Sequence, residues 1–358
     1  MDAQTKVELI KSFAEEIVTE NELLNLFQTN NHPNVYDGFE PSGLAPIHFG
    51  LLRAANLKIM LETGVHFKLY LADYFAFINN KLGGNLQTIQ EAGEYFIEVW
   101  KACGIDTSKV EIVWASKEMD SLKYWDRALK IAKKTTLNRA LKSVTIMGRK
   151  EGENLSFAQL MYPIMQVNDI FQLDLDMCQM GMDQRRANML AREIAETYGW
   201  KKPIAVHHPL LLGLKGIQNN GGTKEEMLAA SKMSKSDPSS CIYMHETYES
   251  LKSKINKAYC PERIVEGNPV MDYAKNIVFK YVKEVKIERP EKYGGNVDYA
   301  NYAMLESDYV SGKLHPADLK LCVTNELEKL IKPVREHFEK NNKAKALYEN
   351  LKNAKITR

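Results

Sequence analysis

The chain has 358 residues, of which 44% are hydrophobic and 9% aromatic, and its formal net charge at pH 7 is +2. A chain of this length and composition buries a large core, and the usual domain size predicts two domains. The near-zero charge excludes a uniformly cationic nucleic-acid-binding chain, so any contact with RNA must come from local patches.

The five cysteines occur singly and form no CxxC pair. This spacing argues against a zinc clip or a redox pair, and we expect no tightly bound metal. The charged N-terminus lacks the apolar stretch of a signal peptide, and no run of 18 uncharged apolar residues occurs. We therefore expect a cytoplasmic protein without membrane contact.

Apolar residues at near-helical spacing predict one amphipathic helix over residues 7–27. After a breaker at 32–34, the pattern predicts a strand at 35–39, a turn at 41–43 and a helix from about 48 to 61. Further strands and helices are predicted at 67–73, 91–103, 110–114, 157–167, 184–198 and 203–206. This alternation predicts an α/β fold, a Rossmann-type doubly wound parallel sheet covered on both faces.

Residues 213–240 are rich in Gly, Asn, Ser and Lys, which predicts a mobile loop of the kind that closes over ligands. From about residue 243 onward helical periodicity dominates. We therefore expect an α/β domain of residues 1–242 and a mainly helical domain of residues 243–358.

Three glycines, Gly38, Gly43 and Gly50, lie in the predicted strand-to-helix turn, where open α/β sheets bind phosphate at backbone N–H groups. His48, near the start of the helix, is suited to donate a hydrogen bond to a phosphate oxygen. A tight turn with a capping histidine explains the same spacing, because Gly-rich turns of this kind are common.

The run Lys232-Met233-Ser234-Lys235-Ser236 places two lysines at i and i+3 in a Ser-rich loop. Two ammonium groups and neighbouring hydroxyls suit a triphosphate. A solvated surface loop is the alternative reading of such a short run.

This run matches KMSKS, the second signature loop of class I aminoacyl-tRNA synthetases, and the segment around His48 resembles their first, HIGH-type motif. Four further segments are similar to tyrosyl-tRNA synthetases of the archaeal and eukaryotic type: residues 36–43, 162–169, 181–186 and 315–320. The resemblance covers the chain from about residue 30 to 340. It implies a homodimer that activates L-tyrosine with ATP and Mg²⁺ and transfers the tyrosine to tRNA(Tyr), with the C-terminal domain binding the anticodon.

A pocket that accepts tyrosine and rejects phenylalanine must hydrogen-bond the phenol. The resemblance assigns Tyr36 and Asp169 to the phenol oxygen, and Tyr162, Gln166 and Gln184 to the ammonium group. The i, i+4 and i+7 spacing of Tyr162, Gln166 and Asp169 places them on one helical face. A core helix explains the packing of Tyr162 but leaves Gln166 and Asp169 buried without partners.

Activation requires no nucleophilic side chain, because the tyrosine carboxylate itself attacks the α-phosphate of ATP. The resemblance assigns His48, Lys232 and Lys235 to the phosphates in the transition state. The full set that it assigns to ATP is Gly38, His48, Gly50, Lys232, Lys235 and Ser236.

For the tRNA, the resemblance assigns Arg185 and Arg186 to the first base pair of the acceptor stem. It assigns Asp318 to the first anticodon base and Tyr293 to stacking on that base. A solvated pair at a helix start explains the two arginines equally, and a loop-packing role beside Gly294 explains Tyr293.

Two features depart from the family pattern. The turn at 44–47 is about two residues longer than expected, and Leu51 stands where the HIGH-type motif usually has its second histidine. A leucine cannot donate to a phosphate, so either that role is dispensable or another group fills it.

Three rival functions remain: a tryptophanyl-tRNA synthetase, a nucleotidyltransferase and a non-catalytic RNA-binding relative. Tyr36 with Asp169 favours a phenol over an indole, whose N–H needs only an acceptor.

Overall fold

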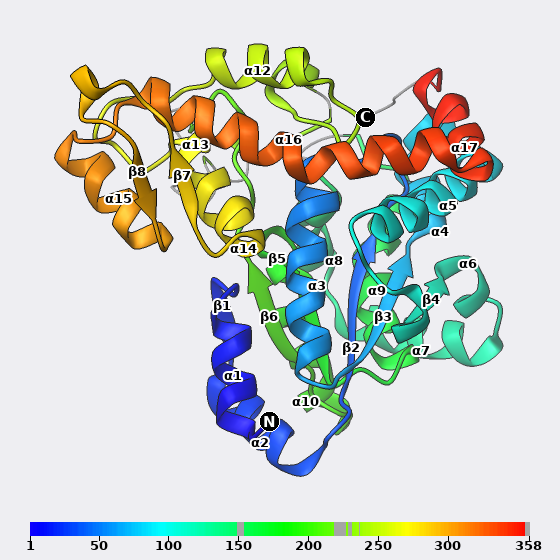
Figure 1. Ribbon diagram of the computed structural model, residues 1–358. Helices are drawn as coiled ribbons and strands as arrows, with labels where there is room; N and C mark the ends of the chain where they lie inside the picture. Colours follow the sequence, from blue (N-terminus) through cyan, green and yellow to red (C-terminus); the bar gives the residue numbers. More distant parts are fainter. Residues whose placement is uncertain (149–153, 218–226, 228–230, 236, 355–358) are drawn as a thin grey trace.

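The computed structural model describes residues 1–148, 154–217, 227, 231–235 and 237–354. A six-stranded sheet in the order β1-β6-β5-β2-β3-β4 forms its centre (Figure 1). The strands are β1 (Glu16–Val18), β2 (Asn34–Phe39), β3 (His66–Leu71), β4 (Val110–Trp114), β5 (Met177–Gly181) and β6 (Ile204–His208). β1 pairs antiparallel with β6 and the other neighbours run parallel, which confirms the predicted α/β fold.

The strand order reverses at β2, because the chain adds β3 and β4 on one side and β5 and β6 on the other. Such a reversal leaves a crevice at the carboxyl ends of the two central strands, and open α/β sheets bind ligands there. Here those ends are Phe39 of β2 and Gly181 of β5.

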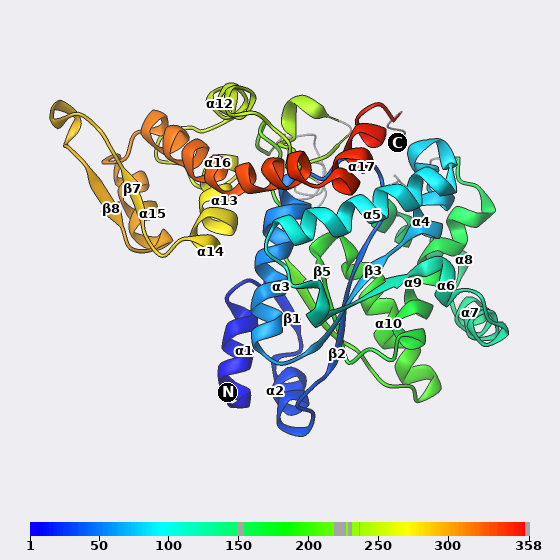
Figure 2. The same cartoon turned by 45° about the vertical axis from the view of Figure 1, so that its right-hand side comes forward.

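Alternate residues of the strands enter two separate cores. Val35 and Phe67 pack with α3 (Arg53–Glu62) and α5 (Leu86–Ala102) on one face. Tyr36 and Tyr70 point to the other face. That face is covered by α7 (Leu122–Lys134), α9 (Phe157–Gln172) and α10 (Arg185–Tyr198) (Figure 2). Shorter helices complete this region: α4 (Asp73–Ile78), α6 (Ala115–Glu118) and α8 (Leu137–Ser143).

The single N-terminal helix predicted over 7–27 is wrong. The segment forms α1 (Ala3–Lys11), strand β1 and α2 (Glu20–Thr29). A capping box starts α2, in which the Thr19 hydroxyl accepts from Glu22 N and the Glu22 carboxylate accepts from Thr19 N. The intervening residues pair with β6, an interaction that a continuous helix would forgo.

The C-terminal region is mainly helical, as predicted. Its helices are α12 (Tyr248–Lys257), α13 (Pro269–Tyr273), α14 (Phe279–Tyr281), α15 (Tyr302–Ser311), α16 (Pro316–Lys340) and α17 (Asn342–Lys352). A small antiparallel pair, β7 (Val285–Ile287) and β8 (Val297–Tyr299), was not predicted.

α17 returns to the sheet domain and lies against α5 in both views (Figures 1 and 2). Lys343 of α17 forms an ion pair with Glu94 of α5 at 3.0 Å, and His337 Nε2 of α16 lies 2.8 Å from Glu98 Oε2 of α5. One apolar core runs from α1 to α17, across the domain boundary predicted at 242/243, and that boundary stays a prediction. Within the described ranges no helix is both long and apolar enough to cross a membrane.

Candidate active site

A continuous cavity of about 3300 Å³ opens at the carboxyl ends of β2 and β5. Its walls come from β2, α9, the segment after β5, the C-terminal helices and residues 231–235, the described part of the loop that carries Lys232 and Lys235, here called the lysine loop. Pockets for one small ligand usually measure ~300–1,000 Å³, so this cavity has room for more than one ligand group.

Some of the residues that line the cavity carry buried polar atoms without partners. Tyr36 Oη, Tyr70 Oη and Asp169 Oδ2 have no hydrogen-bond partner among the described residues, although Tyr70 and Asp169 lie close enough for each to shift the pKa of the other. Tyr124 Oη donates to Asp169 Oδ1 at 2.8 Å, which fixes the carboxylate and leaves its second oxygen open. Because buried polar groups are almost always paired, this cluster marks the place of a polar ligand group. Burial raises the pKa of both Asp169 and Tyr36 well above the usual range.

The predicted ammonium-binding residues lie together beside this cluster. Gln166 Nε2 donates to Gln184 Oε1 at 3.0 Å, and Gln184 Nε2 donates to the Ile146 carbonyl at 2.9 Å. Tyr162 Oη donates to the Glu40 carboxylate. Sequence analysis did not select Glu40, although it lies in the 36–43 motif, and its negative charge lines the same cavity.

The glycines predicted to form the phosphate turn occupy three different settings. Gly43, with φ of 109°, lies in the turn. Gly38 lies in β2 and lines the cavity. Gly50 lies in η1 (His48–Leu52), a π-helical turn, and a Cβ there would come within 2.4 Å of Met244 Sδ. The prediction that all three lie in the turn is therefore wrong for Gly38 and Gly50.

His48 lines the cavity at the start of η1, and its Nδ1 has no partner among the described residues. Burial lowers its pKa to about 3, and the positive charge of Arg53 adds to this shift. The imidazole is therefore neutral at pH 7 and keeps one N–H to donate to an anion.

The long turn before His48 forms part of the scaffold. Ile47 N donates to the Ile242 carbonyl at 2.9 Å, and Met244 N donates to the Ala45 carbonyl at 2.9 Å. This two-stranded contact joins the first signature segment to the residues that follow the lysine loop.

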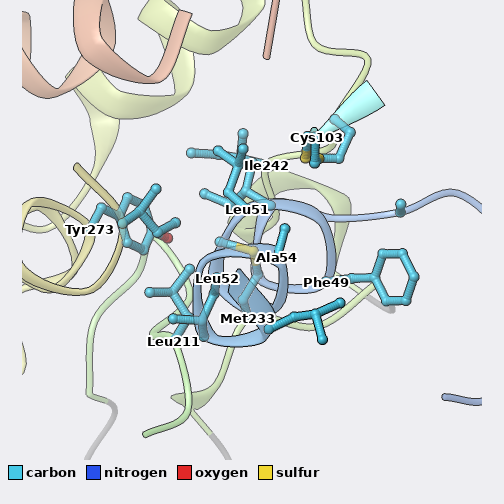
Figure 3. Close-up of a cluster of buried hydrophobic side chains, with 14 of the residues drawn as sticks. Phe49, Leu51, Leu52, Ala54, Cys103, Leu211, Met233, Ile242 and Tyr273 are labelled. Carbon is cyan, nitrogen blue, oxygen red and sulfur yellow. The ribbon is translucent and has the colours of Figure 1, made fainter. Parts of the chain in front are cut away.

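The described part of the lysine loop is anchored at its centre. Met233 is 3% exposed and belongs to the same buried apolar cluster as Leu51 and Leu52 (Figure 3). Its backbone N donates to the Leu211 carbonyl at 2.8 Å. Ser236, predicted to bind the nucleotide, lies outside the described residues.

Both lysines face the cavity from this anchor. Lys232 Nζ pairs with Asp183 Oδ2 at 2.6 Å, and Lys235 Nζ donates to Ser42 Oγ at 3.1 Å. Burial lowers the pKa of Lys235 to about 8. Although burial alone would raise the pKa of Asp183, the charge of Lys232 holds it at about 2. Asp183 is a cavity residue that sequence analysis did not select, despite its place in the 181–186 motif.

Arg185 and Arg186 lie at the start of α10 and line the same cavity. Arg185 Nε donates to both carboxylate oxygens of Glu16 at 2.9 Å. Arg186 Nη1 donates to the Lys142 carbonyl at 2.6 Å.

The two predicted anticodon residues lie in the C-terminal region. Asp318 is in the first turn of α16, and Tyr293 is in η8 (Glu291–Tyr293). Arg289 joins their segments, because it donates to the Gly295 carbonyl at 2.7 Å and to the Lys313 carbonyl at 2.8 Å.

Comparison with known proteins gives consistent matches. The family model for class I tRNA synthetases (W and Y) matches residues 28–332. Tyrosine–tRNA ligase 1, cytoplasmic, of Arabidopsis thaliana is 44% identical over 100% of this chain and 90% of its own length. Tyrosine–tRNA ligase of Sulfurisphaera tokodaii is 43% identical over 98% of this chain and 97% of its own. The crystal structure of the Pyrococcus horikoshii tyrosyl-tRNA synthetase complexed with L-tyrosine has a TM-score of 0.89 at 38% identity, covering 98% of this chain and 100% of that one.

Proposed function

Because this chain belongs to the tyrosine–tRNA ligases of the class I tRNA synthetases, we propose that its central cavity carries out both steps of the ligase reaction. The chain is an ATP-dependent ligase that activates L-tyrosine and attaches it to tRNA(Tyr). The residue assignments that follow are our proposals.

The unpaired Tyr36 Oη and Asp169 Oδ2 carry the assignment of the amino-acid pocket. A tyrosine phenol both donates and accepts, so it satisfies both atoms at once, whereas the ring of phenylalanine leaves both unpaired. Leaving such buried atoms unpaired costs far more than losing an apolar contact. Glu40, Tyr162, Gln166 and Gln184 then lie at the ammonium end of the substrate.

The nucleotide occupies the part of the cavity lined by Gly38, His48 and the two loop lysines. The tyrosine carboxylate oxygen attacks the α-phosphorus, the new bond forms the mixed anhydride, and the breaking bond leaves its electron pair on pyrophosphate. No proton moves in this step, so the protein acts by positioning and by stabilising charge. Mg²⁺ enters as part of the ATP substrate.

Lys232 leaves Asp183 to reach the phosphates in this scheme. In the second step a ribose hydroxyl oxygen of the terminal tRNA adenosine attacks the carbonyl carbon of the adenylate and forms an ester. The bond from that carbon to the phosphate oxygen breaks, AMP leaves with the electron pair, and the hydroxyl proton passes to a phosphate oxygen of AMP or to water. Arg185 and Arg186 face the acceptor stem, and Asp318 and Tyr293 face the anticodon.

A homodimer is the proposed assembly, and a second copy is the proposed occupant of an exposed apolar surface. The exposed apolar side chains are Leu122 and Leu129 of α7 (87% and 66%), Leu137 of α8 (63%) and Phe157 of α9 (78%), and both α7 and α8 pack on α9. Sedimentation velocity should show a dimer that Leu129→Glu with Leu137→Glu converts to monomer. A wild-type monomer at micromolar concentration would contradict it. We also propose a cytoplasmic location, because the similar Arabidopsis ligase is a cytoplasmic one by name.

ATP–pyrophosphate exchange measured with each amino acid in turn tests the function. We expect exchange with tyrosine alone. We also expect Asp169→Ala to lose tyrosine-dependent exchange while ATP binding, measured by calorimetry, persists. Exchange stimulated by tryptophan, or by none, would contradict the substrate, and full activity of Asp169→Ala would show that the pocket is misplaced.

A further inference from the structure

Leu51 stands where the HIGH-type motif usually has its second histidine, so the hydrogen-bond donor of that histidine is missing here. Leu51 is 1% exposed, packs in the apolar cluster of Figure 3 and does not line the cavity. Its carbonyl accepts from Tyr281 Oη at 2.8 Å, which fixes this side of η1 against α14. The position therefore contributes packing and no hydrogen-bond donor.

The π-helical turn η1 joins the backbone of Arg53 to that of His48, and both residues line the cavity. In a π-turn the backbone bond spans five residues, and Arg53 N donates to the His48 carbonyl. This bond joins the backbones of the two residues, and burial and the charge of Arg53 lower the pKa of His48.

A buried carboxylate holds the Arg53 guanidinium in this position. Asp37 of β2 is 2% exposed, and both of its oxygens accept from Arg53 Nη1. The guanidinium also lies over the Phe39 ring at 4.9 Å. Within the described part of the chain, Arg53 Nε and Nη2 make no hydrogen bond, and Arg53 lines the cavity, so these donors are available to a ligand there.

Arg53 acts electrostatically on the other groups of the site. Its charge contributes to the lowered pKa values of His48 and Asp183, which both line the cavity. The Arg53 guanidinium is therefore a permanent positive charge close to the residues assigned to the phosphates.

We propose that Arg53 is a catalytic residue of adenylate formation, which donates to a triphosphate oxygen in place of the missing second histidine, and that Asp37 is its positioning residue. The inference rests on the proposed use of this cavity for ATP. As the carboxylate attacks and the bond to pyrophosphate lengthens, charge builds on phosphate oxygens, and a fixed guanidinium stabilises it without reorganisation. Arginine keeps this charge at all working pH values.

Removing Arg53 alone would leave Asp37 buried without its partner and would destabilise the fold. The test therefore uses Arg53→Gln combined with Asp37→Asn, so that no charge is left unpaired. Rapid-quench single-turnover kinetics should show tyrosyl-adenylate formation slowed by about 10²–10³-fold, the usual effect of losing one such donor. The dissociation constant for tyrosine and the rate of transfer from preformed adenylate to tRNA should stay within about twofold of wild type.

Glu22→Gln combined with Arg192→Gln provides the matched control. Arg192 Nη2 pairs with Glu22 at 2.8 Å. The Arg192 side chain is 12% exposed, and Arg192 does not line the cavity. This variant loses a comparable ion pair and should form adenylate at the wild-type rate.

Three results would decide against the proposal. A near-wild-type single-turnover rate in the Arg53 variant would overturn it. So would an equal loss in the Glu22 control, or a parallel loss of tyrosine affinity, since each indicates a structural role. A wild-type enzyme without tyrosine-dependent exchange would instead overturn the proposed function.

Discussion

At the scale of single residues, the pocket is defined by hydrogen-bonding groups that the protein leaves incomplete. Tyr124 satisfies one oxygen of Asp169, while Tyr36 Oη faces the cavity unpaired. The protein fold thus supplies rigidity, and the substrate completes the hydrogen bonding.

Tyr36→Phe should reduce the preference for tyrosine over phenylalanine. The lost hydroxyl contributes about 1–3 kcal/mol to binding the phenol, so kcat/KM for tyrosine should fall while that for phenylalanine does not. Exchange kinetics with both amino acids measure this. Tyr198→Phe is the control, because Tyr198 Oη donates to the Lys130 carbonyl outside the cavity. Unchanged discrimination in Tyr36→Phe would exclude its role at the phenol.

ATP affinity should fall as pH rises above 8. The pKa of Lys235 is about 8, so above this pH the ligand-free enzyme carries a neutral amine there. Binding the phosphate then requires uptake of a proton, which costs about 1.4 kcal/mol per pH unit. The KM for ATP should rise up to about tenfold between pH 8 and 9.

Lys235→Arg is the control for this pH dependence, because a guanidinium stays charged over the whole range. Its KM for ATP should remain flat between pH 8 and 9. The same rise in both proteins would assign the titration to another group.

At the scale of elements, η1 depends on the absence of a side chain at Gly50. A Cβ there would lie 2.4 Å from Met244 Sδ, and Met244 is fully buried. Gly50→Ala should lower the free energy of unfolding by about 1–3 kcal/mol through overpacking. Urea unfolding measures the loss.

Met244→Ala provides the second arm of a double-mutant cycle. Without the Met244 side chain the clash disappears, and the same Gly50→Ala change should stabilise the protein by about 0.5–1 kcal/mol, the usual helical gain over glycine. Additive losses in the cycle would show that the two residues do not compete for space.

Some elements follow from their residue pattern and others do not. β3 is predictable from its aromatic and leucine residues, and β4 from its β-branched residues. β5 contains no β-branched or aromatic residue, so its pattern carries little strand signal, and pairing with β2 and β6 determines it. The Thr19 capping box is a sequence signal for a new helix start, but the apolar spacing over residues 7–27 predicts one continuous helix instead.

In the candidate site, too, some features follow from the residue pattern and others do not. The helical spacing of Tyr162, Gln166 and Asp169 correctly predicts that they share one face. Pairing of Lys232 with Asp183 depends on the order of the strands, and the backbone hydrogen bond from Arg53 N to the His48 carbonyl depends on a π-turn. Periodicity contains neither fact, so neither contact is predictable from the sequence.

At the scale of the whole molecule, the C-terminal helices are part of the support of the sheet domain. Phe338 of α16 packs on His245 at 4.7 Å and on Tyr95 of α5 at 5.3 Å. Tyr95 Oη in turn contacts His245 Nε2 at 2.9 Å and accepts from Ala45 N at 3.2 Å. Packing at α16 thereby reaches the turn before His48.

Phe338→Ala should cost about 3–5 kcal/mol and lower the melting temperature of the entire chain in one transition. Scanning calorimetry measures the loss of stability and shows whether the chain unfolds in a single transition. Leu321→Ala, on the same helix at a 43% exposed position, should change stability by less than about 0.5 kcal/mol. A separate early transition in Phe338→Ala would show that the C-terminal helices unfold independently.

The backbone contact between residues 45–47 and residues 242–244 limits how this enzyme can be recombined with its relatives. The turn at 44–47 and the segment that follows the lysine loop therefore have to fit each other. A chimera that imports a shorter turn alone would lose its hydrogen-bonding partner, and one that imports both segments would keep it. Grafting experiments on this scaffold should therefore exchange the two signature regions as one unit.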